Sequence, residues 1–123
     1  MNSNTIYEFE NGINFRLFIG FNDKETKTQL ISTAQATELI ENIAFKYFPR
    51  FSLTLSRGGY KNKSGNTFRE NGAILDVIST NIETITNVAN ELEVALNQNS
   101  ILIIAECVYY KFYSQLDTQG KIK

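Results

Sequence analysis

The residues best suited to hold a small molecule lie in one polar, glycine-rich stretch, 57–72, between two strand-like runs. Arg57, Gly58 and Gly59 open it. Glycine lets the main chain approach a ligand closely, and a guanidinium pairs bidentately with anionic oxygens, so this start could bind a phosphate. A glycine-assisted exit from a strand with a solvated arginine explains the same residues equally well.

Aromatic and cationic side chains follow directly. Tyr60 and Phe68 could stack on a base or ribose, as aromatic platforms do for nucleotides. We expect Tyr60 to contact a ligand and Phe68 to tie the long loop to the sheet. Lys61 and Lys63 add positive charge, but their spacing is not that of a Walker loop and no helix follows.

The pair Arg69 and Glu70 closes the polar stretch. It could serve a nucleotide as a cation and an acceptor for ribose hydroxyls. Ion pairing across strands or between subunits is at least as good an interpretation of the pair.

The composition disfavours common catalytic chemistry. The chain has no histidine and a single cysteine, Cys107, which its apolar neighbours predict to be buried. A Cys-His nucleophile within one subunit is therefore excluded, and we expect no metal site and no cofactor. Hydrolysis or cyclisation needs a proton-exchanging group or a metal-bound hydroxide. The residues therefore favour binding without catalysis.

The chain as a whole predicts one soluble domain. It has 123 residues, 42% of them hydrophobic, and a net charge of −1, which suits a single core and disfavours a nucleic acid polymer as partner. No run is apolar and long enough to cross a membrane, and no secretory leader is recognisable. We expect a cytoplasmic protein.

Hydrophobic periodicity predicts four strands and two helices. Capping-box spacings at Ser32–Gln35 and Thr80–Glu83 mark the two helix starts, and Pro49 and the asparagines at 97–99 mark their ends. The strands are expected at 13–21, 51–56, 73–79 and 100–113, with 57–72 as an oversized hairpin loop. Residues 1–12 are expected to be loose or to add an edge strand, and 114–123 to be a polar tail.

The order β-α-β-β-α-β is that of a ferredoxin-like α+β domain, with an antiparallel sheet and two helices on one face. The other face must then be solvated, hold a ligand or meet another subunit. The aromatic load of the first and last strands favours a homo-oligomer, a dimer or a multiple of one.

Several short segments together resemble a family of small α+β proteins: 15–22, 47–54, the Gly59-Tyr60 pair, the triplet 69–71 and 96–102. Similar phage proteins are the anti-Thoeris sponges, which oligomerise and sequester cyclic nucleotide-type signals. The resemblance adds Asn22 to the expected ligand-binding residues. Tyr60 stands where the family often has tryptophan, and 50–52 lacks the usual glycine.

The leading hypothesis is therefore a non-enzymatic, oligomeric protein that sequesters a small phosphorylated nucleotide, plausible for a phage anti-defence sponge. One alternative is an enzyme acting on a small phosphorylated substrate, with Glu70 as the base. The other is a module whose sheet only docks protein.

Overall fold

The computed structural model describes residues 8–114. These form an α+β domain in the predicted order, with four strands and two helices. The elements are β1 (Glu10–Gly20), α2 (Thr33–Tyr47), β2 (Ser52–Lys61), β3 (Thr67–Ser79), α3 (Ile82–Ala95) and β4 (Leu102–Tyr110). No helix among the described residues has the length and hydrophobicity needed to span a membrane.

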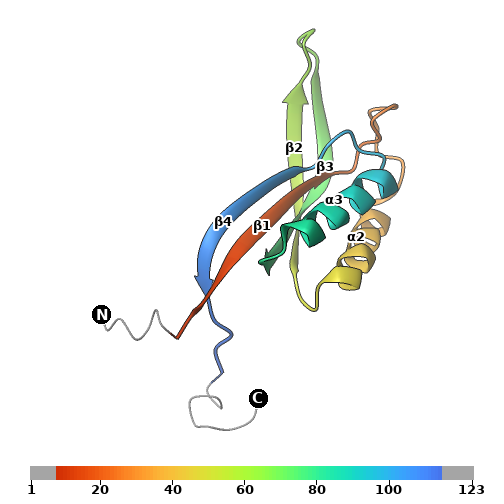
Figure 1. Cartoon of the computed structure of the whole chain (residues 1–123). Coiled ribbons are helices and arrows are strands. Elements are labelled where there is room, and N and C mark those ends of the chain that lie inside the picture. Colours follow the sequence, from red (N-terminus) through yellow and green to blue (C-terminus); the bar gives the residue numbers. More distant parts are fainter. Residues whose placement is uncertain (1–7, 115–123) are drawn as a thin grey trace.

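The four strands form one antiparallel sheet in the order β2-β3-β1-β4. Both helices cover the same face of this sheet, which confirms the ferredoxin-like prediction (Figure 1). The core lies between the two layers, where β1, β3 and the helices contribute its largest fully buried side chains: Leu17, Ile40, Leu75, Ile85, Val88 and Leu92.

The predicted capping box begins α2 as expected. The Ser32 hydroxyl accepts a hydrogen bond from the Gln35 backbone, and the Gln35 side chain accepts one from the Ser32 backbone. The second predicted box, at Thr80–Glu83, is wrong. Asn81 caps α3 instead, by accepting a hydrogen bond from the Thr84 backbone amide, because the short asparagine side chain satisfies an orphan amide without a reciprocal partner.

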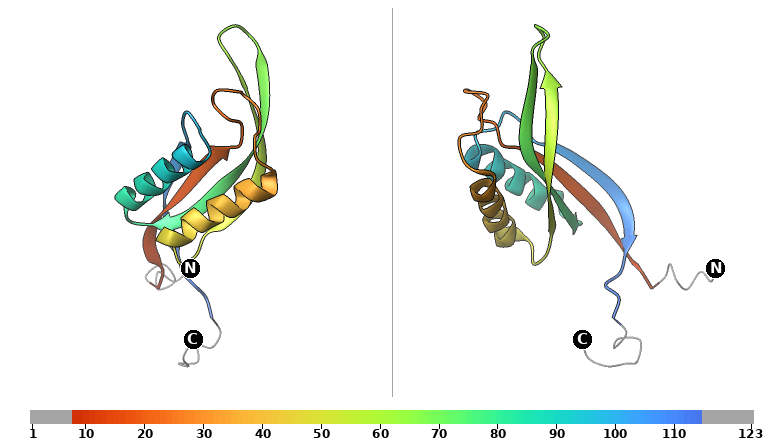
Figure 2. Two further views of the ribbon diagram at one scale, coloured as in Figure 1. Left: turned by 90° about the vertical axis from the view of Figure 1, so that its right-hand side faces the viewer. Right: turned by 180° about the vertical axis from the view of Figure 1, so that it is seen from behind.

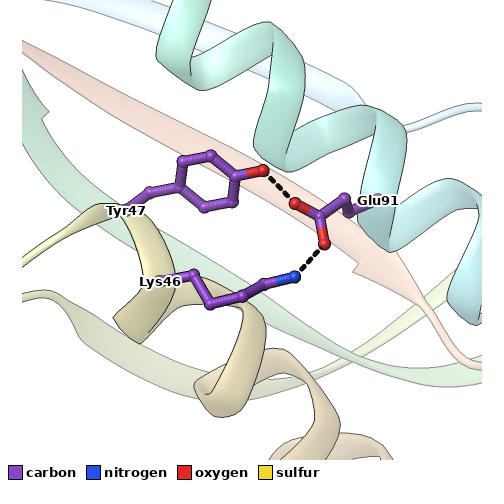
Figure 3. A network of polar contacts seen from close by, with 3 residues as sticks. All are labelled: Lys46, Tyr47 and Glu91. Carbon is purple, nitrogen blue, oxygen red and sulfur yellow. Dashed lines mark hydrogen bonds and ion pairs between the residues drawn. The ribbon is translucent and has the colours of Figure 1, made fainter.

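The two helices are joined by a polar contact at their exposed edge. Glu91 of α3 accepts hydrogen bonds from the ammonium of Lys46 and the hydroxyl of Tyr47 at the end of α2 (Figure 3). The hydrogen bond from Lys46 and then that from Tyr47 lower the pKa of the Glu91 carboxyl, and the bond to Glu91 raises the pKa of Tyr47.

The stretch 57–72 is not an oversized loop. β2 continues to Lys61 and β3 begins at Thr67, paired residue by residue, so the turn itself spans only 62–66. The Asn62 side chain accepts hydrogen bonds from the backbone amides of Ser64 and Asn66, and Gly65 adopts a φ of +86°. These local bonds close the turn, which allows polar residues to extend a two-stranded ribbon beyond the helices (Figure 2).

The last strand is shorter and more exposed than the sequence suggests. β4 ends at Tyr110 instead of extending to 113. Cys107 is exposed, not buried, because β4 lies at the sheet edge, where the helices do not cover it. Phe9 lies before β1; the rest of the possible edge strand, and the tail beyond 114, fall outside the described residues.

The sheet face away from the helices carries the alternate residues of each strand. Phe18 pairs with Ile74 and with Leu102 across β3, β1 and β4, and Leu102 is 60% exposed. Arg16 and Asp76 form an ion pair of 3.1 Å on the same face. We call this surface the open face.

Candidate functional site

A polar cleft of about 230 Å³ lies where the β2–β3 ribbon leaves the sheet. Three segments far apart in the sequence meet there: the loop after β1, the ribbon, and the turn between α3 and β4. The cleft is lined by Asn22, Asp23, Lys24, Lys27, Tyr60, Glu70, Gln98, Asn99 and Ser100. Three of the residues predicted from the sequence, Asn22, Tyr60 and Glu70, therefore line one cavity.

Glu70 supplies a carboxylate at the edge of the open face. Its side chain lies directly over Gly20: a Cβ built on that glycine would stand 2.5 Å from a Glu70 carboxylate oxygen. Glu70 is half-buried, and its Oε2 accepts a hydrogen bond of 3.1 Å from the backbone amide of Asn22. The carboxylate therefore has a defined position, and residues 8–114 make no other hydrogen bond to it that would occupy its remaining acceptor sites.

Asn22 is fixed from several sides. Its side-chain amide donates to the carbonyl of Arg69 at 3.2 Å, and its own carbonyl accepts a hydrogen bond from the Gln98 side chain. Gln98 is 8% exposed and is the buried polar residue of the described chain. Burying a side-chain amide costs free energy unless the amide is hydrogen-bonded. Arrangements of the three segments that break the bond from Gln98 to Asn22 are therefore disfavoured.

A second carboxylate, Asp23, completes the acidic side of the cleft. It accepts hydrogen bonds from the Asn97 side chain at 2.7 Å and from the backbone amides of Glu25 and Thr26. The Asn97 bond, followed by the Thr26 bond, lowers the pKa of the Asp23 carboxyl. Asp23 therefore stays ionised at neutral pH, but its contacts serve the loop more than a ligand.

Tyr60 and Phe68 stack on one another across the ribbon, with ring centroids 5.0 Å apart. They pair in register on the same face as Glu70, two residues further along β3. Tyr60 is 42% exposed. An aromatic surface therefore stands beside the carboxylate, where a planar ring could stack.

The basic residues are placed differently. Arg57, Lys61 and Arg69 alternate with Gly58, Tyr60 and Glu70 and so lie on the opposite face of the ribbon. Arg57 donates to the Asn71 side chain at 3.2 Å, and Lys63 sits in the turn. Gly58 lies on the Glu70 face and Gly59 on the basic face. None of these basic residues lines the cleft.

Sequence reasoning missed six residues that line the cleft: Asp23, Lys24, Lys27, Gln98, Asn99 and Ser100. The last three belong to the polar run after the second helix, which was interpreted as a helix stop, as part of the resembling segment 96–102 and as the start of the last strand, but not as a binding site. The stop itself is confirmed, since Asn97 adopts a φ of +48°. A polar run directly before an apolar strand was the signal that could have indicated a site.

A somewhat larger cavity, of about 280 Å³, lies at the other end of the open face beneath Arg50 and Phe112. Its lining is mostly apolar and holds the paired Asp76 as its one carboxylate. The polar cleft has more groups that could bind or react with a ligand than this cavity, since Asp23 and Glu70 both line it. In the part of the chain that the structure describes, no group of three or more His, Cys, Asp or Glu residues could hold a metal ion.

No protein-family model and no curated protein matches the sequence. The fold, however, is similar to that of a phage SAM lyase solved in complex with S-methyl-5'-thioadenosine. The TM-score is 0.60 at 17% identity, over 84% of this chain and 93% of the lyase chain. The apo form of a phage SAM lyase gives a TM-score of 0.56 at 19% identity, over 85% and 94%.

These neighbours correct the leading hypothesis. The prediction of a non-enzymatic sponge is wrong, since the similar structures are those of an enzyme, and the alternative of an enzyme acting on a small substrate is better supported. The lack of histidine disfavours an enzyme only where the reaction is a hydrolysis or a cyclisation, which needs a proton-exchanging group or a metal-bound hydroxide. A lyase needs no activated water, so the lack of histidine does not count against it. The resemblance is confirmed only as a small α+β fold whose structural neighbours are phage proteins.

Proposed function

We propose that this protein is an enzyme that cleaves a nucleoside sulfonium such as S-adenosylmethionine in the polar cleft, without water. The observation that carries the proposal is the positioned Glu70 carboxylate beside the exposed Tyr60 ring, in a fold shared with phage SAM lyases. A phage source, expected from the resemblance, belongs to the same proposal.

The chemistry suits a cleft whose lining contains no histidine. The bond from sulfur to the γ-carbon of the amino-acid chain breaks, and its electron pair goes to sulfur, which becomes a neutral thioether. The γ-carbon bonds to the substrate's own carboxylate oxygen, which gives a lactone. In the lactone route no proton is transferred, so no general acid or base is required.

Glu70 fits the role of holding the substrate's ammonium group. The sulfonium loses its charge as the bond breaks, so a carboxylate against sulfur would stabilise the reactant more than the transition state. The ammonium keeps its charge throughout. A carboxylate that holds it can orient the amino-acid chain for attack within the molecule, by favouring the conformers in which the substrate's carboxylate oxygen lies close to the γ-carbon.

Tyr60 fits the role of an adenine platform. Its ring is stacked on Phe68 and exposed on the cleft side. Base–aromatic stacking contributes about 1–3 kcal/mol of binding for each base. Asn99 and Ser100 lie across the cleft with hydrogen-bonding groups for ribose hydroxyls or ring nitrogens.

The test is to incubate the purified protein with S-adenosylmethionine and separate the products by chromatography. We expect S-methyl-5'-thioadenosine to accumulate in proportion to protein and time, with no ¹⁸O from labelled water in the four-carbon product when it is trapped before spontaneous lactone opening. Glu70→Ala should lower kcat/KM by at least tenfold. Unchanged substrate after prolonged incubation would refute the proposal, and enzymatic ¹⁸O incorporation would replace the lyase by a hydrolase.

We further propose that the protein is a homo-oligomer, a dimer or a multiple of one, through its open face. Large exposed apolar residues gather there, with Leu102 at 60%, Ile78 at 42% and Ile104 at 37% exposed, and contiguous patches of this kind mark interfaces. Light scattering at micromolar concentration should give a mass of 28 kDa or more, twice the chain's 14.0 kDa. A mass of one chain would refute this proposal.

A further inference from the structure

We infer that Gly20 and Gln98 are positioning residues that together fix the Glu70 carboxylate, Gly20 by leaving space for it and Gln98 by holding the amide that binds it. The inference rests on the proposed function of Glu70. It assigns a role to a strand residue and a buried amide that do not themselves carry the chemistry.

Gly20 is needed for space and not for backbone conformation. A Cβ on Gly20 would stand 2.5 Å from both Cδ and Oε2 of Glu70 and 2.6 Å from Oε1. All three nearest atoms belong to that one carboxylate. The Glu70 carboxylate therefore occupies the volume that any side chain at position 20 would take.

Gly72, the register partner of Gly20, shows the contrast. A Cβ there would meet the backbone carbonyl oxygen of Ile19 at 2.4 Å, an atom that cannot move without the strand. The Glu70 carboxylate ends a flexible side chain and can rotate away. An alanine at position 20 should therefore displace the carboxylate while leaving the fold intact.

Gln98 acts at the second point of attachment. Its backbone amide donates to the carbonyl of Glu93 at 2.9 Å, which anchors it to the end of α3, and its side chain donates to the carbonyl of Asn22. The amide of Asn22 then donates to Glu70 Oε2. The end of α3 is thus connected to the carboxylate through one backbone residue.

These two contacts matter for catalysis because they place the Glu70 carboxylate precisely. Reacting groups must be held close to the productive geometry, and a misplacement of about 1 Å can lower a rate about 100-fold. Glu70 is on a ribbon that extends beyond the core, so the ribbon alone would hold it loosely. The space over Gly20 allows its carboxylate to lie against β1, and the hydrogen bond from the Asn22 amide holds it there. Gln98 connects Asn22 in turn to the end of α3.

The test compares Gly20→Ala and Gln98→Met with a matched control, Gly12→Ala. Gly12 lies on the same strand and the same face, and a Cβ there would also meet side-chain atoms, those of Ile78 and Tyr110 at 2.9 Å, far from the cleft. We expect Gly20→Ala and Gln98→Met to lower kcat about 10-fold to 100-fold, and Gly12→Ala to leave kcat unchanged.

A double-mutant cycle separates positioning from general damage. In a Glu70→Ala background, Gly20→Ala should cause no further loss of kcat, because the group that it displaces is gone. Wild-type kcat in Gly20→Ala, or the same additional loss in both backgrounds, would overturn the inference.

An NMR readout does not depend on turnover. The amide proton resonance of Asn22 should shift upfield in Glu70→Ala, Gly20→Ala and Gln98→Met, as its hydrogen bond is lost, but not in Gly12→Ala. If the wild-type protein fails to cleave the substrate, the proposed function falls, and the positioning of Glu70 is decided by this shift alone. An Asn22 resonance unmoved by Gly20→Ala would overturn the inference even in an active enzyme.

Discussion

Replacement of Gly72 by alanine should destabilise the sheet, because the added methyl group would meet the backbone of the neighbouring strand. The new Cβ would stand 2.4 Å from the carbonyl oxygen of Ile19, whereas real Cβ contacts essentially never fall below 3.0 Å. β1 and β3 would have to separate by about 0.6 Å, the difference between those two distances, and packed interiors resist such shifts. Because both strands pair in the centre of the sheet, neither can yield without losing hydrogen bonds.

The expected cost follows from measured overpacking. Extra methyl groups in well-packed sites cost about 1–3 kcal/mol, and a clash with backbone belongs at the upper end. For a domain of this size, 3 kcal/mol corresponds to a fall in Tm of about 10 °C. Urea unfolding followed by circular dichroism would measure the free energy, with thermal melts as a second readout.

Gly58→Ala is the matched control on the neighbouring strand. A Cβ there would meet nothing within 4 Å, so the substitution should be neutral or stabilise by about 0.4–1 kcal/mol through the unfolded chain. If Gly72→Ala were as stable as the wild type, or no less stable than Gly58→Ala, the close approach of β1 and β3 at this point would be refuted.

Three further outcomes follow from particular contacts. Hydrogen bonds from Lys46 and Tyr47 lower the pKa of Glu91, so the ionised Glu91 carboxylate stabilises the folded state. This stabilisation is fully present above the ordinary pKa of 4.5 and is lost as the pH falls through the lower pKa that Glu91 has in the folded protein. Glu91→Gln should therefore be less stable than the wild type at pH 7, and the difference in unfolding free energy between the two should become smaller in acid. A difference between their urea midpoints that is the same at all pH values would contradict this expectation. Asn97 has a φ of +48°, and its side chain donates a hydrogen bond to Asp23. Asn97→Ala and Asn97→Gly both lose this hydrogen bond, so Asn97→Ala should be less stable than Asn97→Gly by about 1 kcal/mol in the same unfolding measurement, and equal stabilities would contradict the left-handed stop. Cys107 is exposed on the edge strand, so a thiol reagent should label the native protein as fully as the unfolded one, and protection of the thiol would place β4 against another surface.

The candidate site could be predicted in part, because the relevant residue types were concentrated in one stretch. Tyr60 and Glu70 were identified from their chemistry, and Asn22 from the resemblance. Arg57, Gly59, Lys61 and Arg69 were also chosen for their chemistry, as groups that could bind an anion or let it approach the main chain closely. Successive residues of a strand point to opposite faces, and once 57–72 is a ribbon instead of a loop, that alternation separates the basic residues from the carboxylate.

The prediction of a non-enzymatic protein was wrong for a chemical reason. The lack of histidine disfavours chemistry that must activate water, because histidine is the most common general base, but a substrate with a good leaving group needs no activated water. The sequence shows which chemical groups the protein has, whereas the reaction also depends on the reactivity of the substrate, above all on its leaving group.

The sequence by itself determined the element order, the first helix start and the helix stop within the asparagines at 97–99. These follow from local bonding and from periodicity, which depend on residues a few positions apart. Only the tertiary structure decided that Gly20 lies under Glu70 and that Gln98 reaches Asn22, and it alone exposed Cys107 at the sheet edge. Each of these facts depends on strand register and on the position of the helix layer, which bring together residues about 50 to 80 positions apart.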